Sequence, residues 1–513
     1  MAGRIAKSIK NAKVGLVFCS LNLLFTFFAR RYFIDFLGSD LLGLNSIVVS
    51  LLSFLNIAEL GIAAAVAFSL YTPLFQGDHS KINAIISIQG YLYRNIALFI
   101  TAVSLILIFF FPFIFEKVDF PLYYAYATFF ALLVNVILGY VVNYKQIIFQ
   151  ADQKNYTVTY ICQGGKFLKI IAQILILVYL DPSYSYWLWL SMEVISAVFI
   201  SISLEIAVKK YYPYLKTSIR IGKQIRKQHA YLLKTTKQVF FHKIGGFALM
   251  QTSPLVIYTY ANLNLVTIFE NYNLILLGTI LLISNLFNGL VSAVGNLIAE
   301  NIPEKITKIY WELFAFRTWL SGLIIFGFVL LCDPFISLWL GKEFIMPRSA
   351  FFFLTAIFFL RLFRENTDIF LSAFGLYKDI WAPITEAVLN IGLSFLLGYY
   401  WGLTGILCGV FISLFLIIFL WKPYFLFKEK MNISPASYFK GMLKHLILLS
   451  LALILSYALI KIIPIDPSAS FAYCALYGLC ILVVFSFISL PLFYFVFPGM
   501  RDFFARIFAY YQH

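Results

Sequence analysis

The chain has 513 residues and a net charge of +16; 62% of its residues are hydrophobic and only 12% are charged. Soluble globular domains are about 45–50% apolar and about 25% charged, and a soluble fold of this length could not hide so much apolar surface from water. The composition therefore excludes a soluble protein and predicts a polytopic membrane protein.

Apolar runs of helical length recur along the whole chain. Crossing a bilayer takes about 20 mostly apolar residues as a helix, and the runs lack the short alternating segments of a β-barrel. We predict an all-α integral membrane protein with about fourteen transmembrane helices. The expected spans are residues 14–37, 42–70, 92–115, 121–149, 156–180, 184–208, 239–262, 267–298, 312–340, 349–374, 379–400, 402–427, 443–463 and 469–497.

The Lys and Arg residues of the loops orient these spans, because cytoplasmic loops carry an excess of positive charge. With the N-terminus inside, nearly all loop Lys and Arg residues fall on the cytoplasmic side. Only Lys117, Lys342, Arg348 and Lys461 fall on the other side. We therefore expect an even number of helices with both termini in the cytoplasm. Most of the positive charge then faces anionic lipid, so no nucleic-acid partner is expected, and the basic run 209–238 is interpreted as a linker lying on the membrane.

Sequence signatures of catalysis are missing. The five histidines are scattered without H-E-x-x-H spacing, and the chain has neither a P-loop nor a G-x-S-x-G motif. The six cysteines form no C-x-x-C pair. With short outer loops as well, the sequence favours a transporter over an enzyme, with no metal site and no catalytic residue.

Two pairs of basic residues lie near the middle of expected spans. Lys166 and Lys169, and likewise Arg361 and Arg364, are three residues apart and so share a helix face. Charges at this depth cost several kcal/mol and mark a substrate path or a charged partner. One interpretation is structural ion pairing with carboxylates, for which the candidates are Glu59, Glu193, Glu205, Glu365, Asp368 and Glu386. The other is a cationic cavity for a phosphate-bearing substrate, because guanidinium groups match phosphate oxygens.

Four more arginines lie nearer the ends of the spans. Arg94 and Arg317 lie close to cytoplasmic helix starts, where snorkelling of the side chain to the interface explains them. Arg30 and Arg31 lie near the outer end of the first span, where snorkelling and a functional role are both open.

Several segments carry a family resemblance. They are "FFARRYFIDFLGSDLLGLNSIVVSLLSFLNIAELGIAAAVAFSLYTPL" (27–74), "NYKQIIFQADQKNY" (143–156), "FHKIGGFALMQTSPLVIYTYANLNLVTIFENYNLI" (241–275), "SAVGNLIAE" (292–300) and "GLYKDIWAPITEAVLNIGLS" (375–394). Together they resemble bacterial polysaccharide flippases of the multidrug/oligosaccharidyl-lipid/polysaccharide (MOP) superfamily, which includes the Wzx-type O-antigen and capsule exporters.

The resemblance implies two six-helix lobes around a central cavity plus two C-terminal helices. The corresponding bounds are 1–208 for the first lobe, 209–238 for the linker, 239–427 for the second lobe and 428–513 for the added helices and tail. It further implies alternating-access transport of an undecaprenyl-pyrophosphate-linked oligosaccharide across the bacterial cytoplasmic (inner) membrane. Glycan polymerase and glycosyltransferase partners follow from that role, and we expect a monomer within the lipid bilayer.

The resemblance also suggests site residues. Arg30 matches a basic residue that ends the first helix, Glu59 falls in the family's "AELG" turn, and Glu386 falls in its "E-A-x-x-N" segment. The predicted substrate-binding residues are Arg30, Arg31, Lys166, Lys169, Arg361 and Arg364, with Glu59 and Glu386 as gate or ion partner. Family members often carry an acidic residue where this chain has Ser253. No cofactor is expected, and coupling to H⁺ or Na⁺ stays open.

Three rival interpretations remain. A multidrug/cation antiporter of the same superfamily would need acidic rather than basic cavity residues. A membrane-bound glycan polymerase or acyltransferase would need larger outer loops and a His-plus-carboxylate motif. A structural scaffold would have little reason to keep charges at membrane depth.

Overall fold

The described chain is helical throughout. The computed structural model describes residues 2–59, 62–118, 120–225, 252–287, 290–376, 378–431 and 433–511, and every element in these ranges is a helix or a helical turn. Within these ranges, ten helices are long and apolar enough to cross a membrane. The prediction of an all-α membrane protein is confirmed.

The chain divides by its internal packing into two compact units, Met1–Glu270 and Asn271–His513. The division falls inside α13 (Leu263–Phe287). Of the expected linker 209–238, only residues 209–225 lie within the described ranges. The expected domain bounds therefore stay a prediction.

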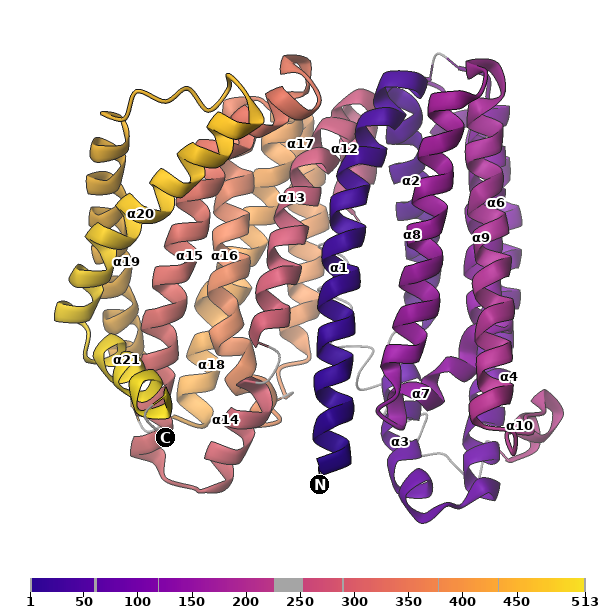
Figure 1. The fold of residues 1–513 in the computed structure, drawn as a ribbon, viewed down its shortest axis with the longest axis horizontal. Coiled ribbons are helices and arrows are strands. Elements are labelled where there is room, and N and C mark those ends of the chain that lie inside the picture. The colour runs from indigo at the N-terminus through magenta and orange to yellow at the C-terminus, as the bar shows by residue number, and fades with distance from the viewer. Residues whose placement is uncertain are drawn as a thin grey trace. The chain divides into compact units, whose positions relative to one another are not determined.

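The first unit is built from long helices with shorter ones at their ends. Its elements are α1 (Ala2–Leu37), α2 (Ser39–Leu55), η1 (Asn56–Glu59), α3 (Ile62–Gln76), α4 (His79–Phe109), α5 (Phe111–Ile114), α6 (Tyr123–Val141), η2 (Asn143–Gln146), α7 (Ile147–Ala151), α8 (Asn155–Tyr179), α9 (Pro182–Tyr211), α10 (Ile219–Ile225) and α12 (Ser253–Tyr260). Helix α8 packs against both α1 and α9, and α6 packs against α2, α4 and α9 (Figure 1). Much of the expected seventh span, 239–262, lies outside the described residues.

The expected span 42–70 is not one continuous helix. It consists of α2 and α3, separated by the 3₁₀ turn η1, which carries the polar side chains Asn56 and Glu59. Both side chains bond to Tyr140 of α6. Polar side chains are expensive in a bilayer unless they are satisfied, so the break places them against a neighbouring helix instead of lipid.

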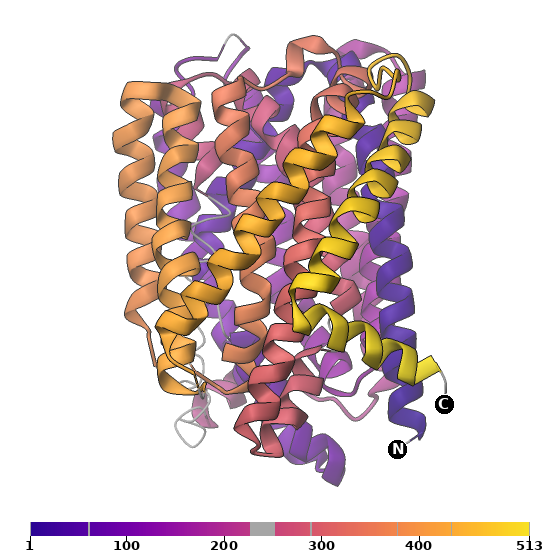
Figure 2. The same ribbon diagram turned by 90° about the vertical axis from the view of Figure 1, so that its left-hand side faces the viewer.

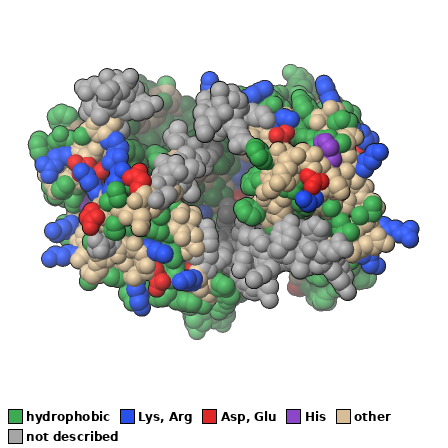
Figure 3. Space-filling model, turned by 90° about the horizontal axis from the view of Figure 1, so that it is seen from below, with side chains coloured by type: hydrophobic (Ala, Val, Ile, Leu, Met, Phe, Trp, Pro, Cys, Tyr) green, Lys and Arg blue, Asp and Glu red, His purple; other side chains and the backbone are tan. Residues whose placement is uncertain are grey.

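Basic residues of the first unit gather at one end of its helices. The start of α1, the α3–α4 turn, α7 and α10 all lie at this end (Figure 1), and Lys81, Lys145, Lys154 and Lys209 occupy the turns and helix ends there. Figure 3 views the molecule from below and shows Lys and Arg side chains scattered over the described surface. This arrangement is the one expected of a cytoplasmic face.

The second unit contains the remaining helices. They are α14 (Leu290–Ala299), α15 (Pro303–Trp339), η3 (Lys342–Phe344), α16 (Arg348–Ala373), α17 (Trp381–Leu414), the π-helical η4 (Phe415–Trp421), α18 (Lys422–Glu429), α19 (Pro435–Ile460), α20 (Phe471–Val496) and α21 (Pro498–Tyr511). A core that includes Phe326, Leu449 and Phe485 joins α15, α19 and α20. Helix α21 turns away from α20 and packs on α15 (Figure 2).

The segment α17–α18 contains two of the expected spans, 379–400 and 402–427. The backbone turns at Gly402, whose φ of 55° lies in the left-handed region that favours glycine. Beyond the turn, Gly405 lies so close to the Leu397 carbonyl that a Cβ there would collide with it. The segment is therefore a helical hairpin whose two arms are held together through glycines.

Candidate functional site

An ion pair between α15 and α16 fixes one of the buried arginines. The Nη1 atom of Arg317 lies 2.7 Å from the Oε2 atom of Glu365, and the Arg317 residue is only 5% exposed. Ser284 of α13 donates to the other oxygen of Glu365 at 3.0 Å. Arg317 therefore does not snorkel to the interface as expected; its charge is compensated inside the second unit.

The predicted residues Arg361, Arg364 and Glu386 come together in the same unit. Arg364 of α16 pairs with Asp368, Nε to Oδ2 2.7 Å, one helical turn further on. Both arginines interact electrostatically with Glu386 of α17. Glu386 is 4% exposed, and its Oε1 atom is buried without a hydrogen-bond partner among the described residues. Arg361 forms no ion pair within the described ranges, so of the two arginines it has the less compensated charge.

The other four predicted basic residues lie on two neighbouring helices of the first unit. Helices α1 and α8 run in parallel. Asn11, near the start of α1, bonds to the start of α8, and Asn22 bonds to Gln163 at a later position in both helices. The aromatic contact between Phe25 and Phe167 continues this register. Lys166 and Lys169 therefore lie about one to two turns before the level of Arg30 and Arg31.

These four side chains differ in their partners. The Nζ atom of Lys169 lies 2.7 Å from Oε2 of Glu193 on α9, and the pair is largely buried. Lys166 is exposed and forms no ion pair within the described ranges. Arg30 donates from Nη1 to the Glu270 carbonyl at 3.2 Å. Arg31 pairs with Asp35 at 2.7 Å, with both side chains partly exposed.

The predicted residue Glu59 lies in a polar cavity of about 450 Å³ within the first unit. Tyr93 of α4 donates to its Oε1 at 2.7 Å, and Tyr140 of α6 lies 3.1 Å from its Oε2. Asn56 lies 3.1 Å from the Tyr140 hydroxyl. Gln89, also in the lining, is 1% exposed, and its Oε1 is buried without a partner among the described residues. The described lining contains no Lys or Arg.

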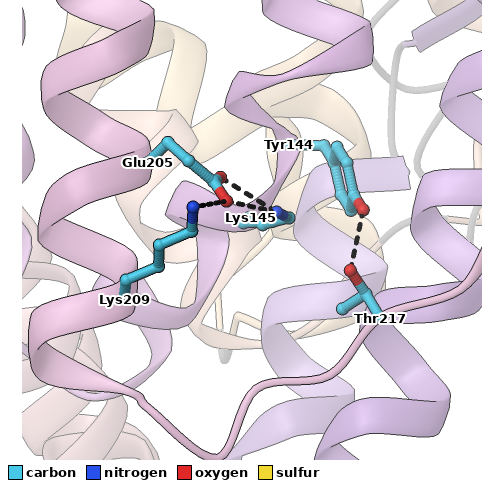
Figure 4. Close-up of polar contacts among 5 residues, drawn as sticks. All are labelled: Tyr144, Lys145, Glu205, Lys209 and Thr217. Carbon is cyan, nitrogen blue, oxygen red and sulfur yellow. Dashed lines mark hydrogen bonds and ion pairs between the residues drawn. The ribbon is translucent and has the colours of Figure 1, made fainter.

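Polar contacts beside this cavity hold η2 against α9 and the segment that follows α9 (Figure 4). Lys145 bonds to both oxygens of Glu205 at 2.9 Å, and Lys209 lies 3.8 Å from the same carboxylate. Tyr144, which lines the cavity, bonds to Thr217 at 3.1 Å.

The segment after α9 folds back along α4. Asn83 donates to the Tyr214 carbonyl at 3.2 Å and accepts from the Lys216 amide at 3.0 Å. The Tyr212 hydroxyl donates to Asp152 at 2.9 Å. Burial, and to a smaller extent the nearby Asp152 carboxylate, raises the pKa of the Tyr212 phenol, so the hydroxyl keeps its proton and remains a donor at neutral pH. The described part of the expected linker is therefore fixed to the first unit.

The lining residues Gln89, Tyr93, Asn135 and Tyr140 are not among the residues that the sequence predicts. They belong to no motif, and tyrosines are common in membrane helices for packing alone. The available signal is the presence of amides such as Asn135 inside an otherwise apolar span. Only the folded chain brings these amides to Glu59.

Comparisons with solved structures find the same architecture in known transporters. The lipid II flippase MurJ in an inward closed conformation matches with a TM-score of 0.64 and 15% identity, over 94% of this chain and 98% of that chain. A multidrug resistance MATE family transporter of the MOP superfamily, in an inward-facing conformation, matches with a TM-score of 0.59 and 15% identity, over 80% and 97%. A MATE structure in a bent conformation matches with a TM-score of 0.52 and 16% identity, over 82% of this chain and 94% of that chain.

Sequence comparisons add no relative, because no protein-family model and no curated protein matches the chain. At sequence identities near 15%, these matches show that the fold is shared but not that the substrate is shared. The resemblance predicted from the sequence is confirmed at this level. The chain has the fold of the MOP-superfamily transporters.

Proposed function

We propose that the protein is a flippase that moves an undecaprenyl-pyrophosphate-linked oligosaccharide from the inner to the outer face of the bacterial cytoplasmic membrane. The observation that carries this proposal is the likeness to a lipid II flippase over 94% of the chain, together with basic residues inside its spans. A lipid pyrophosphate with a hydrated glycan faces about 30 Å of hydrocarbon. A polar, basic path lowers that barrier while the isoprenoid tail stays in lipid.

The pyrophosphate would be bound by the basic residues of the spans. Lys166 and Arg361 have the strongest claim, because neither forms an ion pair among the described residues. Arg30, Arg31 and Arg364 complete the set through guanidinium groups that can bind phosphate oxygens in pairs. Lys169 has a weaker claim, because Glu193 already neutralises it.

Ion coupling, where it exists, would involve a carboxylate at membrane depth. Glu386 is buried beside Arg361 and Arg364, and Glu59 is held by two tyrosines. A H⁺ or Na⁺ bound at either residue would change the local charge and bias the chain between its two access states. No cofactor is required for this cycle.

The proposal also implies partners. A glycosyltransferase would build the lipid-linked oligosaccharide on the cytoplasmic side, and a glycan polymerase would use it after transfer. We expect the flippase itself to act as a monomer with both termini in the cytoplasm.

Reconstitution tests the proposal directly. The purified chain would be placed in liposomes that contain lipid-linked oligosaccharide extracted from the host bacterium with this gene deleted. We expect a membrane-impermeant lectin to bind more glycan over time than in protein-free liposomes. A lectin signal that matches the protein-free control would refute the flippase.

A multidrug/cation antiporter is the second candidate. It is favoured by the likeness to a MATE family transporter and by the single carboxylate in a cavity whose described lining has no Lys or Arg. Ethidium efflux from everted membrane vesicles distinguishes the two, since a glycan flippase should not move this aromatic cation.

A further inference from the structure

The polar cavity of the first unit has a chemistry unlike that of the basic residues proposed for the pyrophosphate. Its volume of about 450 Å³ falls within the range of about 300–1,000 Å³ typical of small-molecule sites. The lining is formed by residues of several helical elements: η1, α3, α4, α6, η2, α7 and α8.

The lining consists mainly of carboxamides and phenols with one carboxylate. Asn56, Gln89 and Asn135 are among its amides, and Tyr93 and Tyr140 are among its phenols. Each amide presents two N–H donors and a carbonyl acceptor, and each phenol can donate and accept. Hydroxyl-rich ligands need this mixture, because every sugar hydroxyl is both a donor and an acceptor.

Some hydrogen-bonding capacity of the lining residues is unused. Gln89 is 1% exposed and its Oε1 has no partner among the described residues. The carboxylate of Glu59 accepts one tyrosine on each oxygen, which leaves lone pairs free on both. Buried polar groups are normally paired, so turning the Gln89 side chain toward a ligand hydroxyl in the cavity would pair an oxygen that has no partner among the described residues.

Charge excludes the phosphate group from this cavity. A pyrophosphate would meet the Glu59 carboxylate with no Lys or Arg in the described lining to offset the repulsion. A lone metal or sodium ion would need converging oxygen ligands, whereas the amides here are spread over several helices around a space much larger than one ion.

We propose that this cavity binds the saccharide part of the lipid-linked substrate. The inference rests on the proposed flippase function and assigns the two ends of the substrate to different residues. Basic side chains bind the pyrophosphate, and the Glu59 cavity binds sugar rings through amide, phenol and carboxylate hydrogen bonds.

Gly139 allows the cavity to be filled without removing any polar group. It lies in the lining on α6, and a Cβ added there would meet no atom within 4 Å. Gly139→Leu would therefore occupy space that the sugar needs. Gln89→Leu is the complementary change, because it removes the amide whose oxygen has no partner among the described residues and leaves a side chain of similar size. Gly327→Leu in α15 is the matched control, since a Cβ there also meets no atom within 4 Å and the residue is not in the lining.

Binding would be measured by native mass spectrometry on the full chain, with two probes. One is undecaprenyl pyrophosphate without sugar; the other is the lipid-linked oligosaccharide pool extracted from the host with this gene deleted. We expect Gly139→Leu and Gln89→Leu to bind the oligosaccharide probe about tenfold more weakly than wild type, as for loss of one or more hydrogen bonds. Both variants should bind undecaprenyl pyrophosphate as wild type does, and Gly327→Leu should match wild type with both probes.

The results separate the two hypotheses. If wild type binds the glycan probe and both cavity variants bind it equally well, the saccharide site is wrong while the flippase stands. If wild type binds neither lipid, the flippase itself fails. If either cavity variant loses both probes while Gly327→Leu keeps both, the cavity is not specific for sugar and the assignment is overturned. Weaker binding of ²²Na⁺ in the variants, with unchanged binding of glycan, would overturn it in favour of a cation site.

Discussion

Charged side chains at membrane depth fall into two kinds in this protein. Lys169 and Arg317 each have a carboxylate at 2.7 Å on a neighbouring helix, whereas Lys166 and Arg361 form no ion pair among the described residues. Removing one partner of a buried pair leaves an uncompensated charge and costs about 3–5 kcal/mol. Replacing a cation that forms no ion pair leaves no such buried partner at hydrogen-bonding distance, so substitution should separate stability from transport.

The pair Lys169–Glu193 should behave as a structural element. We expect Glu193→Gln to lower the thermal midpoint of the purified protein, with a cost of about 3–5 kcal/mol from the unpaired lysine. The double variant Lys169→Met with Glu193→Met should recover most of that loss, because no charge is then buried alone. A double-mutant cycle in detergent measures the coupling. If the double variant is stable but transports no glycan, Lys169 has a functional role beside its structural one.

Arg361 and Arg317 offer a matched comparison on α16 and α15. Arg361→Gln should leave the thermal midpoint nearly unchanged and reduce lipid-linked glycan transport about tenfold or more, since a charge-assisted hydrogen bond to phosphate is worth about 1.5–3 kcal/mol. Arg317→Gln should instead destabilise the protein, because Glu365 loses its partner. Lectin accessibility in proteoliposomes and thermal unfolding are the two measurements. Equal transport by Arg361→Gln and wild type would remove Arg361 from the substrate path.

Among the elements, the hairpin of α17 shows how glycine spacing sets a close helix contact. A Cβ at Gly409 would lie 2.6 Å from the Ser394 amide nitrogen on the opposite arm. A Cβ at Gly392, in the same helix, would meet no atom within 4 Å. Small residues let membrane helices approach closely, and their packing supplies much of the association energy.

The same substitution should therefore have opposite effects at these two glycines. Gly409→Ala should destabilise the hairpin by about 1–3 kcal/mol through overpacking against backbone that cannot move aside easily. Gly392→Ala should be neutral or stabilise by up to about 1 kcal/mol, because alanine favours the helix. Thermal unfolding in one detergent compares the two variants. A loss of stability at both positions would mean that helix contact is not what Gly409 provides.

At the scale of the whole molecule, the distribution of charge predicts orientation. In the first unit, Lys81, Lys145, Lys154 and Lys209 all lie at the end where α1 begins. The positive-inside rule predicts that this end faces the cytoplasm, and the expected even number of spans predicts that the C-terminus lies there too. Two reporters fused after His513 test this. Green fluorescent protein, which is active only in the cytoplasm, should fluoresce, and alkaline phosphatase, which is active only outside it, should be inactive. The reverse pattern would contradict the even helix count.

The sequence by itself determined the fold class, the approximate spans and the basic residues within them. Backbone groups in a bilayer must bond within their own segment, so long apolar runs such as 156–180 and 443–463 must be helices whatever their neighbours are. The break between α2 and α3 was not predicted, since hydropathy averages over the few polar residues of η1.

Only the tertiary structure decided which charges are paired and where a cavity forms. Lys166 and Lys169 share a helix face in the sequence, yet Glu193 reaches only one of them. Glu59 meets Tyr93 and Tyr140 because three helices pack together. The physical reason is that hydropathy depends on each segment alone, whereas pairing depends on the rotation and register of helices from distant parts of the chain.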